Sequence, residues 1–325
     1  MKTSRLLSSL TLTATFLILA FQSPVFGSSP DSTPTISGTI SVGGNPYGVG
    51  IDLATHRVYV ANSSSNTVSV IDGLANLVVD TIDVPGGSGG LAVDSSIDRI
   101  FVVGDNTVTA IDSRTDEIVA SIGVGSGCGG VDINPTTHVV YVACYYSHSL
   151  YSINGQTNSV TAVTGGFGEA GSVAVNTETH LIYVANLWQK SISIMSADSG
   201  LIVGTINLGT NPHFVAVDSA TNTVYVTERD SNALAVISGD TGTIKTVISV
   251  GSYPRGITID SPNHRIYVAN EVDGTVTIID SNSNLVVGTY TSGTRSLMLA
   301  VDPGLRTVYT ANYTDNTVSI FNSNS

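Results

Sequence analysis

Short apolar runs separated by turn-forming residues recur along nearly the whole chain. Each repeat of about 42 residues contains four such runs, rich in Val, Ile and Thr and bounded by Gly, Asn, Asp or Ser. This pattern predicts four antiparallel β-strands per repeat. No 3.6-residue period is sustained after residue 27, which argues against helices. One aromatic residue marks each copy, at steps of 42, 40, 42, 42, 42 and 42 residues: Tyr59, Phe101, Tyr141, Tyr183, Tyr225, Tyr267 and Tyr309.

Seven copies of a four-stranded unit predict an all-β fold, a seven-bladed β-propeller. The run around each aromatic is continuously apolar, as from Leu181 to Ala185, and a strand of this kind is buried on both faces. A propeller provides that burial because each blade packs between two others. The seventh copy stops after its third strand, at Phe321, whereas residues 35–42 match the missing fourth strand. We therefore expect the N-terminal strand to complete the last blade, so that residues 36–325 form one closed domain.

Several of the aromatic strands share one sequence signature. The tetrapeptide Tyr-Val-Ala-Asn occurs at residues 59–62, 183–186 and 267–270. Each copy is followed by a strand similar to residues 67–72, which read Thr-Val-Ser-Val-Ile-Asp. In these motifs residues 36–325 resemble the YVTN family of β-propeller repeats. The resemblance implies the propeller fold and a cell-surface or extracellular setting, as in surface-layer and other exported proteins, but no single activity. Two copies depart from the signature because they end in Gly104 and Cys144 in place of Asn. These departures weaken the expectation for the local turns more than the expectation for the fold.

Residues 1–27 have the composition of a secretory signal peptide. Lys2 and Arg5 precede an almost uncharged apolar stretch, and small residues stand at positions −3 and −1 before the expected cleavage after Gly27. An uncleaved membrane anchor is the alternative, but a bilayer span needs about 20 apolar residues, and Ser and Thr interrupt this stretch. Residues 28–35 are rich in Ser, Pro, Asp and Thr, which is typical of a flexible lead-in.

Removal of the signal changes the formal net charge from −13 to −15, because ten Lys and Arg then stand against 25 Asp and Glu. An acidic chain of this kind repels phosphate backbones and anionic lipids. We therefore expect no nucleic-acid partner and no membrane insertion after signal removal. We expect a monomer that is secreted or held at the cell surface, outside the cytoplasm, and whose partner is a protein or glycan of the cell envelope.

Many conspicuous polar residues fall at equivalent positions of the repeat, where turns are expected. Seven residues before each aromatic stands an Asp or Asn, and a second Asp or Asn ends the third strand of most copies. Such side chains cap the backbone amides of their own turns. Four histidines lie three residues before the aromatic, in separate blades: His56, His138, His180 and His264. Their spread around the ring argues against a shared metal site, and we expect neither a metal nor a cofactor.

Cys128 and Cys144 are the two cysteines of the chain. If the first hairpin of the third repeat turns around residues 135–138, the two cysteines face each other on neighbouring strands. Their Cβ atoms are then about 4.5 to 5.5 Å apart, which a modest local adjustment brings to disulfide distance. We expect a disulfide in an oxidising compartment, and two buried thiols are the alternative.

The loops between repeats are where the sequence stops repeating. Ligands are expected at the face that carries the loops from the fourth to the first strand and from the second to the third, around the central channel. Twelve residues before the aromatics, at the expected channel mouth, stand Tyr47, Gly89, Gly129, Gly171, His213, Arg255 and Leu297. The mouth is therefore expected to be open over blades 2 to 4 and lined with side chains over blades 5, 6, 7 and 1.

The second-to-third loops add aromatic and charged residues, a composition typical of binding patches. The sequence thus predicts a ligand site over blades 4 to 6, with these candidate residues: Tyr47, Trp188, Lys190, His213, Glu228, Arg229, Arg255 and Glu271. The alternative is that exposed loops accumulate such residues without a function.

Two classes of function remain open. Seven regular repeats, short loops and no dedicated nucleophile favour a non-enzymatic recognition or structural protein, whose loop face binds a protein or glycan or which packs into a surface array. The alternative is a lyase or hydrolase. Residues 211–214 and 225–228 are similar to blades of streptogramin lyases, which implies His213 as the base and Glu228 as its orienting partner or metal ligand. Only one copy carries this His, and fold analogy carries little functional weight, so we favour recognition over an enzyme.

Overall fold

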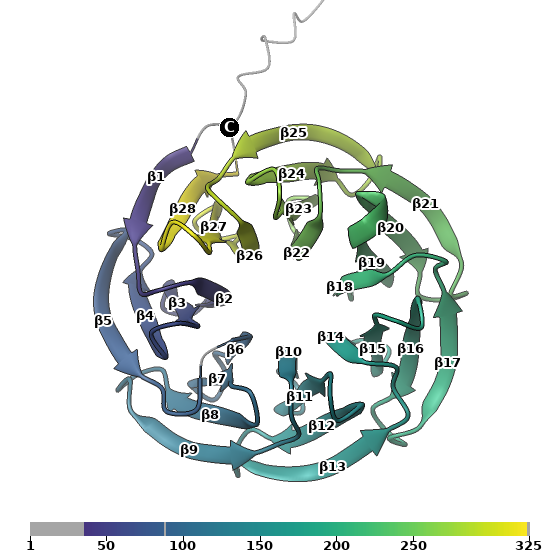
Figure 1. The fold of residues 1–325 in the computed structure, drawn as a ribbon, viewed down its shortest axis with the longest axis horizontal. Coiled ribbons are helices and arrows are strands. Elements are labelled where there is room, and N and C mark those ends of the chain that lie inside the picture. Colours follow the sequence, from purple (N-terminus) through teal and green to yellow (C-terminus); the bar gives the residue numbers. More distant parts are fainter. Residues whose placement is uncertain (1–35, 88, 324–325) are drawn as a thin grey trace, which may run out of the picture. The chain divides into compact units, whose positions relative to one another are not determined.

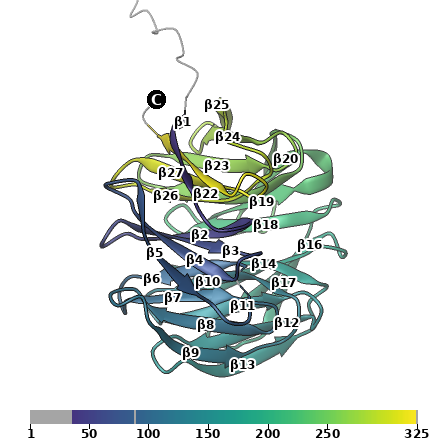
Figure 2. The same cartoon turned by 60° about the vertical axis from the view of Figure 1, so that its left-hand side comes forward.

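The computed structural model describes residues 36–87 and 89–323, which form an all-β ring of seven four-stranded blades (Figure 1). The expected signal peptide at residues 1–27 and the lead-in at 28–35 lie outside these residues. In every blade neighbouring strands pair antiparallel. The first strand lines the channel, and the fourth, such as β5, β9 or β13, lies on the outside of the ring (Figures 1 and 2). The predicted seven-bladed propeller is confirmed.

The first four blades follow one another along the chain. Blade 1 consists of β2 (Pro46–Asp52), β3 (Arg57–Asn62), β4 (Thr67–Asp72) and β5 (Leu77–Asp83). Blade 2 consists of β6 (Leu91–Asp94), β7 (Arg99–Val103), β8 (Thr107–Asp112) and β9 (Ile118–Gly123). Blade 3 consists of β10 (Cys128–Asn134), β11 (Val139–Cys144), β12 (Ser149–Asn154) and β13 (Ser159–Gly165). Blade 4 consists of β14 (Ala170–Asn176), β15 (Leu181–Asn186), β16 (Ser191–Ser196) and β17 (Ile202–Asn207).

The last three blades complete the ring. Blade 5 consists of β18 (Pro212–Asp218), β19 (Thr223–Glu228), β20 (Ala233–Ser238) and β21 (Ile244–Ser249), with a short 3-10 helix, η1 (Arg229–Ser231), after β19. Blade 6 consists of β22 (Pro254–Asp260), β23 (Arg265–Asn270), β24 (Thr275–Asp280) and β25 (Leu285–Thr291). Blade 7 consists of β26 (Ser296–Asp302), β27 (Thr307–Asn312), β28 (Thr317–Asn322) and β1 (Ile36–Ser41). Helix content is therefore minimal, as the sequence predicts.

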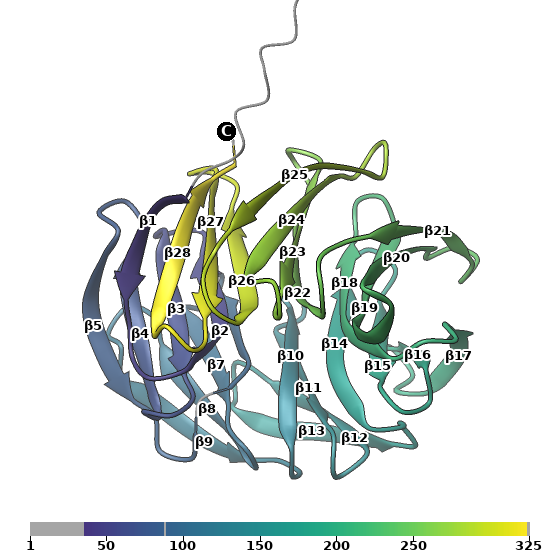
Figure 3. The ribbon, with the colours of Figure 1, turned by 45° about the horizontal axis from the view of Figure 1, so that its top comes forward.

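The ring closes through strands from both ends of the propeller. β1 pairs antiparallel with β28, with Thr39 opposite Ser319 and Ile40 opposite Val318, and the two strands lie side by side in Figure 3. The Val42 amide extends the ladder by donating to the Asn316 carbonyl at 3.0 Å. The N-terminal strand therefore completes the last blade, as predicted.

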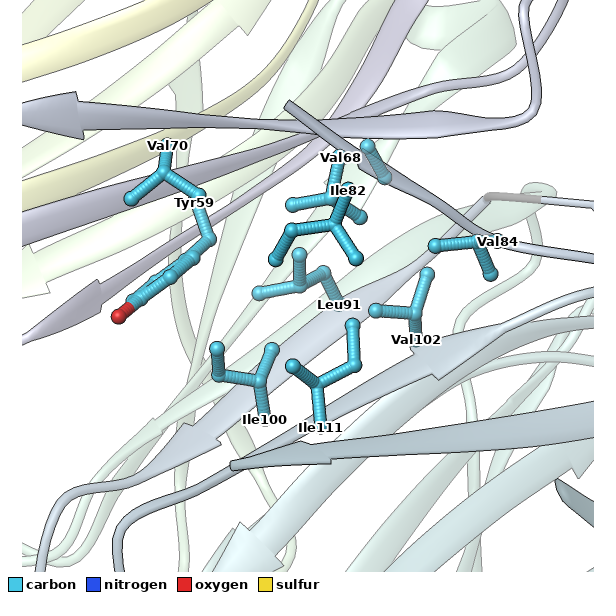
Figure 4. Packing of buried hydrophobic residues seen from close by; sticks show 10 residues of the cluster. Tyr59, Val68, Val70, Ile82, Val84, Leu91, Ile100, Val102 and Ile111 are labelled. Atoms are coloured by element: carbon cyan, nitrogen blue, oxygen red, sulfur yellow. The ribbon is translucent and has the colours of Figure 1, made fainter. Parts of the chain in front are cut away.

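The aromatic residue that marks each repeat is buried between two blades. Tyr59 on β3 packs with Ile100 of the next blade in one apolar cluster (Figure 4). Its hydroxyl donates to the Ser113 carbonyl at 3.2 Å, in the outer turn of that blade, and Tyr309 makes the equivalent bond to the Gly73 carbonyl at 3.2 Å. Burial of one such large side chain stabilises the fold by about 2 kcal/mol. Apolar packing and one directed bond thus hold these blades to their neighbours.

The turns opposite the channel mouth use the Asp, Asn and His residues of the repeat. The residue three before each aromatic has a left-handed backbone, with φ between 47° and 58°. Two of the four histidines at this position also reach the preceding blade: His56 Nδ1 lies 2.7 Å from Asp302 Oδ2, and His138 Nδ1 lies 2.9 Å from Asp94 Oδ2. Both carboxylates also cap amides of their own turns. These residues therefore serve turns and contacts between blades.

The end of the second strand is fixed at the mouth by one side chain in most blades. Asn62 is fully buried, and its Nδ2 donates to Thr67 Oγ1 at 3.0 Å and to Ser69 Oγ at 2.9 Å, across the loop to the next strand. In blade 3 this Asn is replaced by Cys144, which is the register partner of Cys128 and forms a disulfide with it. The predicted bridge is confirmed, and disulfides are typical of proteins outside the cytoplasm.

Among the residues that the structure describes, no helix combines the length and the apolar character needed to cross a bilayer.

We predict that replacing Cys128 and Cys144 together with Ser lowers the free energy of unfolding by about 3 kcal/mol. The bridge joins residues 16 apart, and closing a loop of this size restricts the unfolded chain. Equilibrium denaturation in urea measures the difference. Reductant should destabilise the natural protein by the same amount and leave the double variant unchanged. A double variant as stable as the oxidised natural protein would contradict a stabilising role of the disulfide.

Candidate functional site

The mouth of the channel is uneven around the ring. The inter-blade loops and the second-to-third loops meet on this face, opposite the Asp-capped turns. At the position twelve residues before each aromatic, blades 2 to 4 have a glycine: Gly89, Gly129 and Gly171. The remaining blades have Tyr47, His213, Arg255 and Leu297 at this position. Long side chains therefore gather on one side of the opening.

Arg255 is the centre of a network that joins blade 6 to blades 7 and 1. Its Nη1 donates to Glu271 Oε2 at 2.8 Å and its Nη2 to the Tyr47 hydroxyl at 3.3 Å, with Cζ 5.2 Å from the Tyr47 ring centroid. Arg295 donates to the other oxygen of Glu271, from Nε at 3.0 Å and from Nη2. The Cζ atom of Arg295 lies 4.8 Å from the centroid of the Tyr313 ring. Ion pairs and cation–π contacts thus cross the mouth.

Glu271 lies between the two guanidinium groups, and its side chain is 8 % exposed. Burial alone would raise its pKa, but the hydrogen bond from Arg295 and the charge of Arg255 outweigh burial and hold the pKa of Glu271 below its ordinary value. Two guanidinium groups and one carboxylate leave one net positive charge. This network is therefore locally positive in a protein whose formal net charge is −13, although Glu228 and Asp230 lie at the same mouth.

His213 on β18 lies beside Arg255, at the same repeat position of the neighbouring blade. Their blades are joined because Thr227 Oγ1 donates to the Arg255 carbonyl at 2.9 Å. Burial, followed by the charges of Arg255 and Arg229, lowers the pKa of His213 to about 3, although a hydrogen bond to the Pro254 carbonyl opposes the shift. The imidazole is therefore neutral at physiological pH. Its Nδ1 is buried and has no hydrogen-bond partner within the described ranges.

Glu228 ends β19 in the same blade and is 4 % exposed. Its Oε2 accepts a hydrogen bond from Ser231 Oγ at 3.0 Å, at the end of η1. No hydrogen bond joins Glu228 to His213 in residues 36–87 and 89–323, and no group of three or more His, Cys, Asp or Glu there is placed to hold a metal ion. The pair that the enzyme hypothesis needs is therefore not assembled as a hydrogen-bonded unit.

Arg229 and Tyr253 complete this side of the mouth. Tyr253, like Arg295 of blade 7, is not among the candidates from the sequence. Arg229 Nε donates to Asp230 Oδ1 at 3.1 Å, and its Cζ lies 4.8 Å from the centroid of the Tyr253 ring. Tyr253 also meets His213 edge to face, at 6.1 Å between centroids. Tyr253 and Arg295 both lie fourteen residues before an aromatic and have left-handed backbones, with φ of 59° and 57°. The alignment of the repeats that located His213, twelve residues before an aromatic, also contains the position fourteen residues before it.

An aromatic group stands over blades 3 and 4. Tyr145 and Tyr146 meet edge to face at 5.0 Å between centroids, and the Trp188 indole N–H donates to the Tyr145 hydroxyl. Tyr146 and Trp188 are 70 % and 62 % exposed. Lys190 follows in the same loop as an exposed turn residue with φ of 52°, and it makes no ion pair with the part of the chain that the structure describes. Trp188 therefore belongs to this surface, whereas Lys190 shapes a turn.

A pocket of about 200 Å³ lies between the aromatic group and the mouth. Its walls come from Tyr47, Tyr145, Gly171, Leu187, Pro212, His213 and Phe214. These residues belong to blades 3, 4 and 5, with Tyr47 from blade 1. The pocket therefore overlaps the predicted site over blades 4 to 6 in part and extends toward the glycine-lined side.

The central channel beneath the mouth contains one unusual carboxylate. Asp132 on β10 faces a cavity of about 280 Å³, at the repeat position where the other blades have Gly, Ala or Thr. Its Oδ1 accepts the Ile133 amide and its Oδ2 the Val175 amide of blade 4, both at 2.8 Å. The side chain is partly buried and the channel walls surround it, and this desolvation raises the pKa of Asp132 to about 6 against those two hydrogen bonds.

Comparison with known proteins places the chain among β-propellers. Residues 214–287, in blades 5 and 6, match the family described as Lactonase, 7-bladed beta-propeller. No curated protein matches the chain. Among solved structures it is similar to Kuenenia stuttgartiensis hydrazine synthase, with a TM-score of 0.76 and 16 % identity over 91 % of this chain and 98 % of that one. At this identity the likeness shows the fold alone.

We predict that Glu271→Ala lowers the free energy of unfolding by about 3 kcal/mol, because it leaves the buried guanidinium of Arg255 without its carboxylate. Thermal or urea unfolding measures the loss. The matched control is Glu178→Ala, an exposed glutamate whose removal should change stability by less than about 0.5 kcal/mol. Equal stability of the two variants would show that the network does not hold the mouth together.

We predict that the stability of Asp132→Asn relative to the natural protein rises with pH. With a pKa of about 6, the folded state binds the Asp132 proton more tightly than the unfolded chain does, so its contribution is complete at low pH and is lost as pH rises from about 4 to about 6. Asn accepts only one of the two amide hydrogen bonds, so the variant should be less stable at pH 3.5, and the difference in the free energy of unfolding should shift in its favour by roughly 1 to 3 kcal/mol by pH 7.5. Urea unfolding at both pH values measures this shift; a difference that is the same at both pH values refutes the prediction.

Proposed function

We propose that the protein is an exported, non-enzymatic recognition protein of the cell surface or extracellular space, and that its loop face binds a glycan of the cell envelope. The observation that carries this proposal is the state of the charged groups at the mouth. Arg255, Arg295 and Glu271 are engaged with one another, and Arg229 pairs with Asp230. His213 is neutral. Such a mouth holds and orients a ligand without offering an acid and base pair.

The shape of the site supports a glycan in preference to a protein. A stable protein interface buries about 800 Å² on each partner, whereas this pocket is a small concavity with exposed aromatic rings beside it. Tyr146 and Trp188 are exposed aromatic rings, a surface on which the C–H side of a sugar packs, and Tyr145, which accepts a hydrogen bond from Trp188, lines the pocket.

Two features support the extracytoplasmic setting. The Cys128–Cys144 disulfide suits an oxidising compartment. The Tyr-Val-Ala-Asn strands resemble those of the YVTN repeat family, which occurs in surface-layer and other exported proteins. A signal peptide at residues 1–27 belongs to the same proposal.

A propeller hydrolase or lyase is the second candidate, and the match of blades 5 and 6 to the Lactonase family favours it. In that case His213 and Glu228 carry the reaction, after a rearrangement that brings the two side chains together. A panel of simple lactones, followed by pH-stat titration, tests this candidate. Turnover that disappears in both His213→Ala and Glu228→Gln would replace the recognition proposal.

Binding to an array of immobilised oligosaccharides and polysaccharides tests the recognition proposal. We expect the purified protein to bind a subset of glycans, and Tyr145→Ala combined with Trp188→Ala to weaken that binding about tenfold or more. Leu74→Ala, an exposed apolar residue on the opposite face, is the control and should leave binding unchanged. Capture of an envelope protein with the same dependence on Tyr145 and Trp188, and no glycan, would show that the ligand is a protein.

A further inference from the structure

The disulfide of blade 3 occupies the place of a side-chain clamp that other blades have. At the end of the second strand, Asn62 and its counterparts in blades 4, 6 and 7 donate from Nδ2 to hydroxyls of the third strand, across the loop between the two strands. In blade 3 this position is Cys144, which is bonded instead to Cys128 at the start of the first strand. The loop of residues 145–148 is therefore held by the disulfide in place of the Asn clamp.

That loop carries the aromatic side of the candidate site. Tyr145 directly follows Cys144, lines the pocket of about 200 Å³ and accepts the hydrogen bond of the Trp188 indole. Tyr146 is the next residue and meets Tyr145 edge to face. Any displacement of this loop therefore changes both the pocket wall and the contact with Trp188.

The other half of the disulfide belongs to a glycine-rich segment, residues 123–130, in which five of the eight residues are glycine. Gly127 has a left-handed backbone, with φ of 68°, and its carbonyl accepts the Tyr145 amide at 2.9 Å. The ring of Tyr146 lies so close to Gly127 that a Cβ there would collide with it. This segment therefore supports both tyrosines.

The two cysteines differ in burial and in their surroundings. Cys144 is fully buried in an apolar cluster that includes Phe101 of blade 2, whereas Cys128 is only partly buried. A thiolate from solution therefore reaches the sulfur of Cys128 more readily. Two thiols also need more room than two bonded sulfurs, because they meet at van der Waals distance. The glycine-rich segment moves more easily than the packed strand that ends at Cys144.

Hydrogen bonds to blade 2 determine where the segment remains once the disulfide is open. The Gly127 amide donates to Asp105 Oδ1 at 3.2 Å, and the Cys128 amide donates to the Asp105 carbonyl at 3.2 Å. These bonds do not involve blade 3. After reduction the segment therefore stays with blade 2, while the tyrosines of blade 3 lose their support.

We propose that the Cys128–Cys144 disulfide is a redox switch of the mouth. The oxidised form holds Tyr145 and Tyr146 in place, and reduction by a small thiol releases residues 123–130 and separates the Trp188 indole from Tyr145. This conformational change does not depend on the proposed function, whereas its effect on a ligand rests on the proposed recognition of a glycan.

The exchange uses two thiol groups of the reagent. A thiolate attacks Sγ of Cys128, the S–S bond breaks, and the sulfur of Cys144 leaves as a thiolate and takes up a proton. A second reagent thiolate then attacks the reagent sulfur of the mixed disulfide, and Cys128 leaves and is protonated in turn. The protons are those that the two reagent thiols release. The reagent is oxidised to its own disulfide, and the protein disulfide is reduced to two thiols.

The test follows the indole of Trp188 by NMR in the purified full-length protein. Trp188 is the single tryptophan of the chain, so its indole N–H gives one resonance in a ¹H–¹⁵N spectrum. We expect dithiothreitol to move this resonance upfield, toward its position in Tyr145→Phe, because the hydrogen bond to the Tyr145 hydroxyl is lost. The dispersed amide resonances of the sheets should remain. An indole resonance that stays in place, or a collapse of the whole spectrum, would overturn the switch.

Two double variants separate the disulfide from its effect on the loop. Cys128→Ser with Cys144→Ser should show the reduced indole position without reductant. Cys128→Ala with Cys144→Asn reproduces the pair Ala170 and Asn186 of blade 4, and Ser149 supplies the first hydroxyl for the clamp. This second variant should keep the oxidised indole position with and without reductant. A resonance that moves with dithiothreitol in either variant would show that the reagent acts elsewhere.

Binding to the glycan array in both redox states tests the consequence for a ligand. We expect dithiothreitol to weaken the binding of the retained glycans at least about fivefold and to leave the Cys128→Ala, Cys144→Asn double variant unaffected. Equal binding in both states, with an indole resonance that moves, would show that the switch does not control the ligand. If the array retains no glycan, the recognition proposal fails, and the indole resonance still decides whether the switch exists.

Discussion

The pairing of β1 with β28 is the constraint on which the rest of the structure depends. It joins the first strand of the propeller to its last, covers the edge of β28 and completes the four-stranded sheet of blade 7. β1 leads directly into the loop before Tyr47, so closing the ring also places Tyr47 at the mouth. Arg255 of blade 6 then reaches the Tyr47 hydroxyl. The arrangement of the mouth is therefore a consequence of ring closure.

Burial around the channel acts on its ionisable groups in one direction. It lowers the pKa of His213 to about 3 and raises that of Asp132 to about 6, so both shifts favour the neutral form. At the mouth, side chains keep their charge where they form ion pairs, as Arg255 and Glu271 do. An interior of this kind suits a neutral, hydroxylated ligand better than an ion, which connects the electrostatics of the channel to the proposed recognition of a sugar.

The fold could be predicted because its determinants repeat: an aromatic at nearly constant spacing specifies the blades, and the hairpin register that places Cys128 opposite Cys144 follows from the same alignment. The site was less predictable. The alignment located His213, but the contact of Arg295 with Glu271 depends on a left-handed loop residue and on packing between blades. Lys190 belongs to the predicted patch by sequence, yet it is an exposed turn residue, because a loop residue's position along the chain does not determine its contacts.

The protonation of His213 tests the central claim most directly, because the mouth is a neutral binding site only if this imidazole stays uncharged. The ¹⁵N chemical shifts of its ring nitrogens, followed by NMR from pH 3 to pH 8, report that state. The structure predicts a neutral ring throughout pH 5 to 8, with titration near pH 3. A midpoint near the ordinary histidine value of about 6.5 would contradict it, since His213 would then be a solvated group able to act as a base.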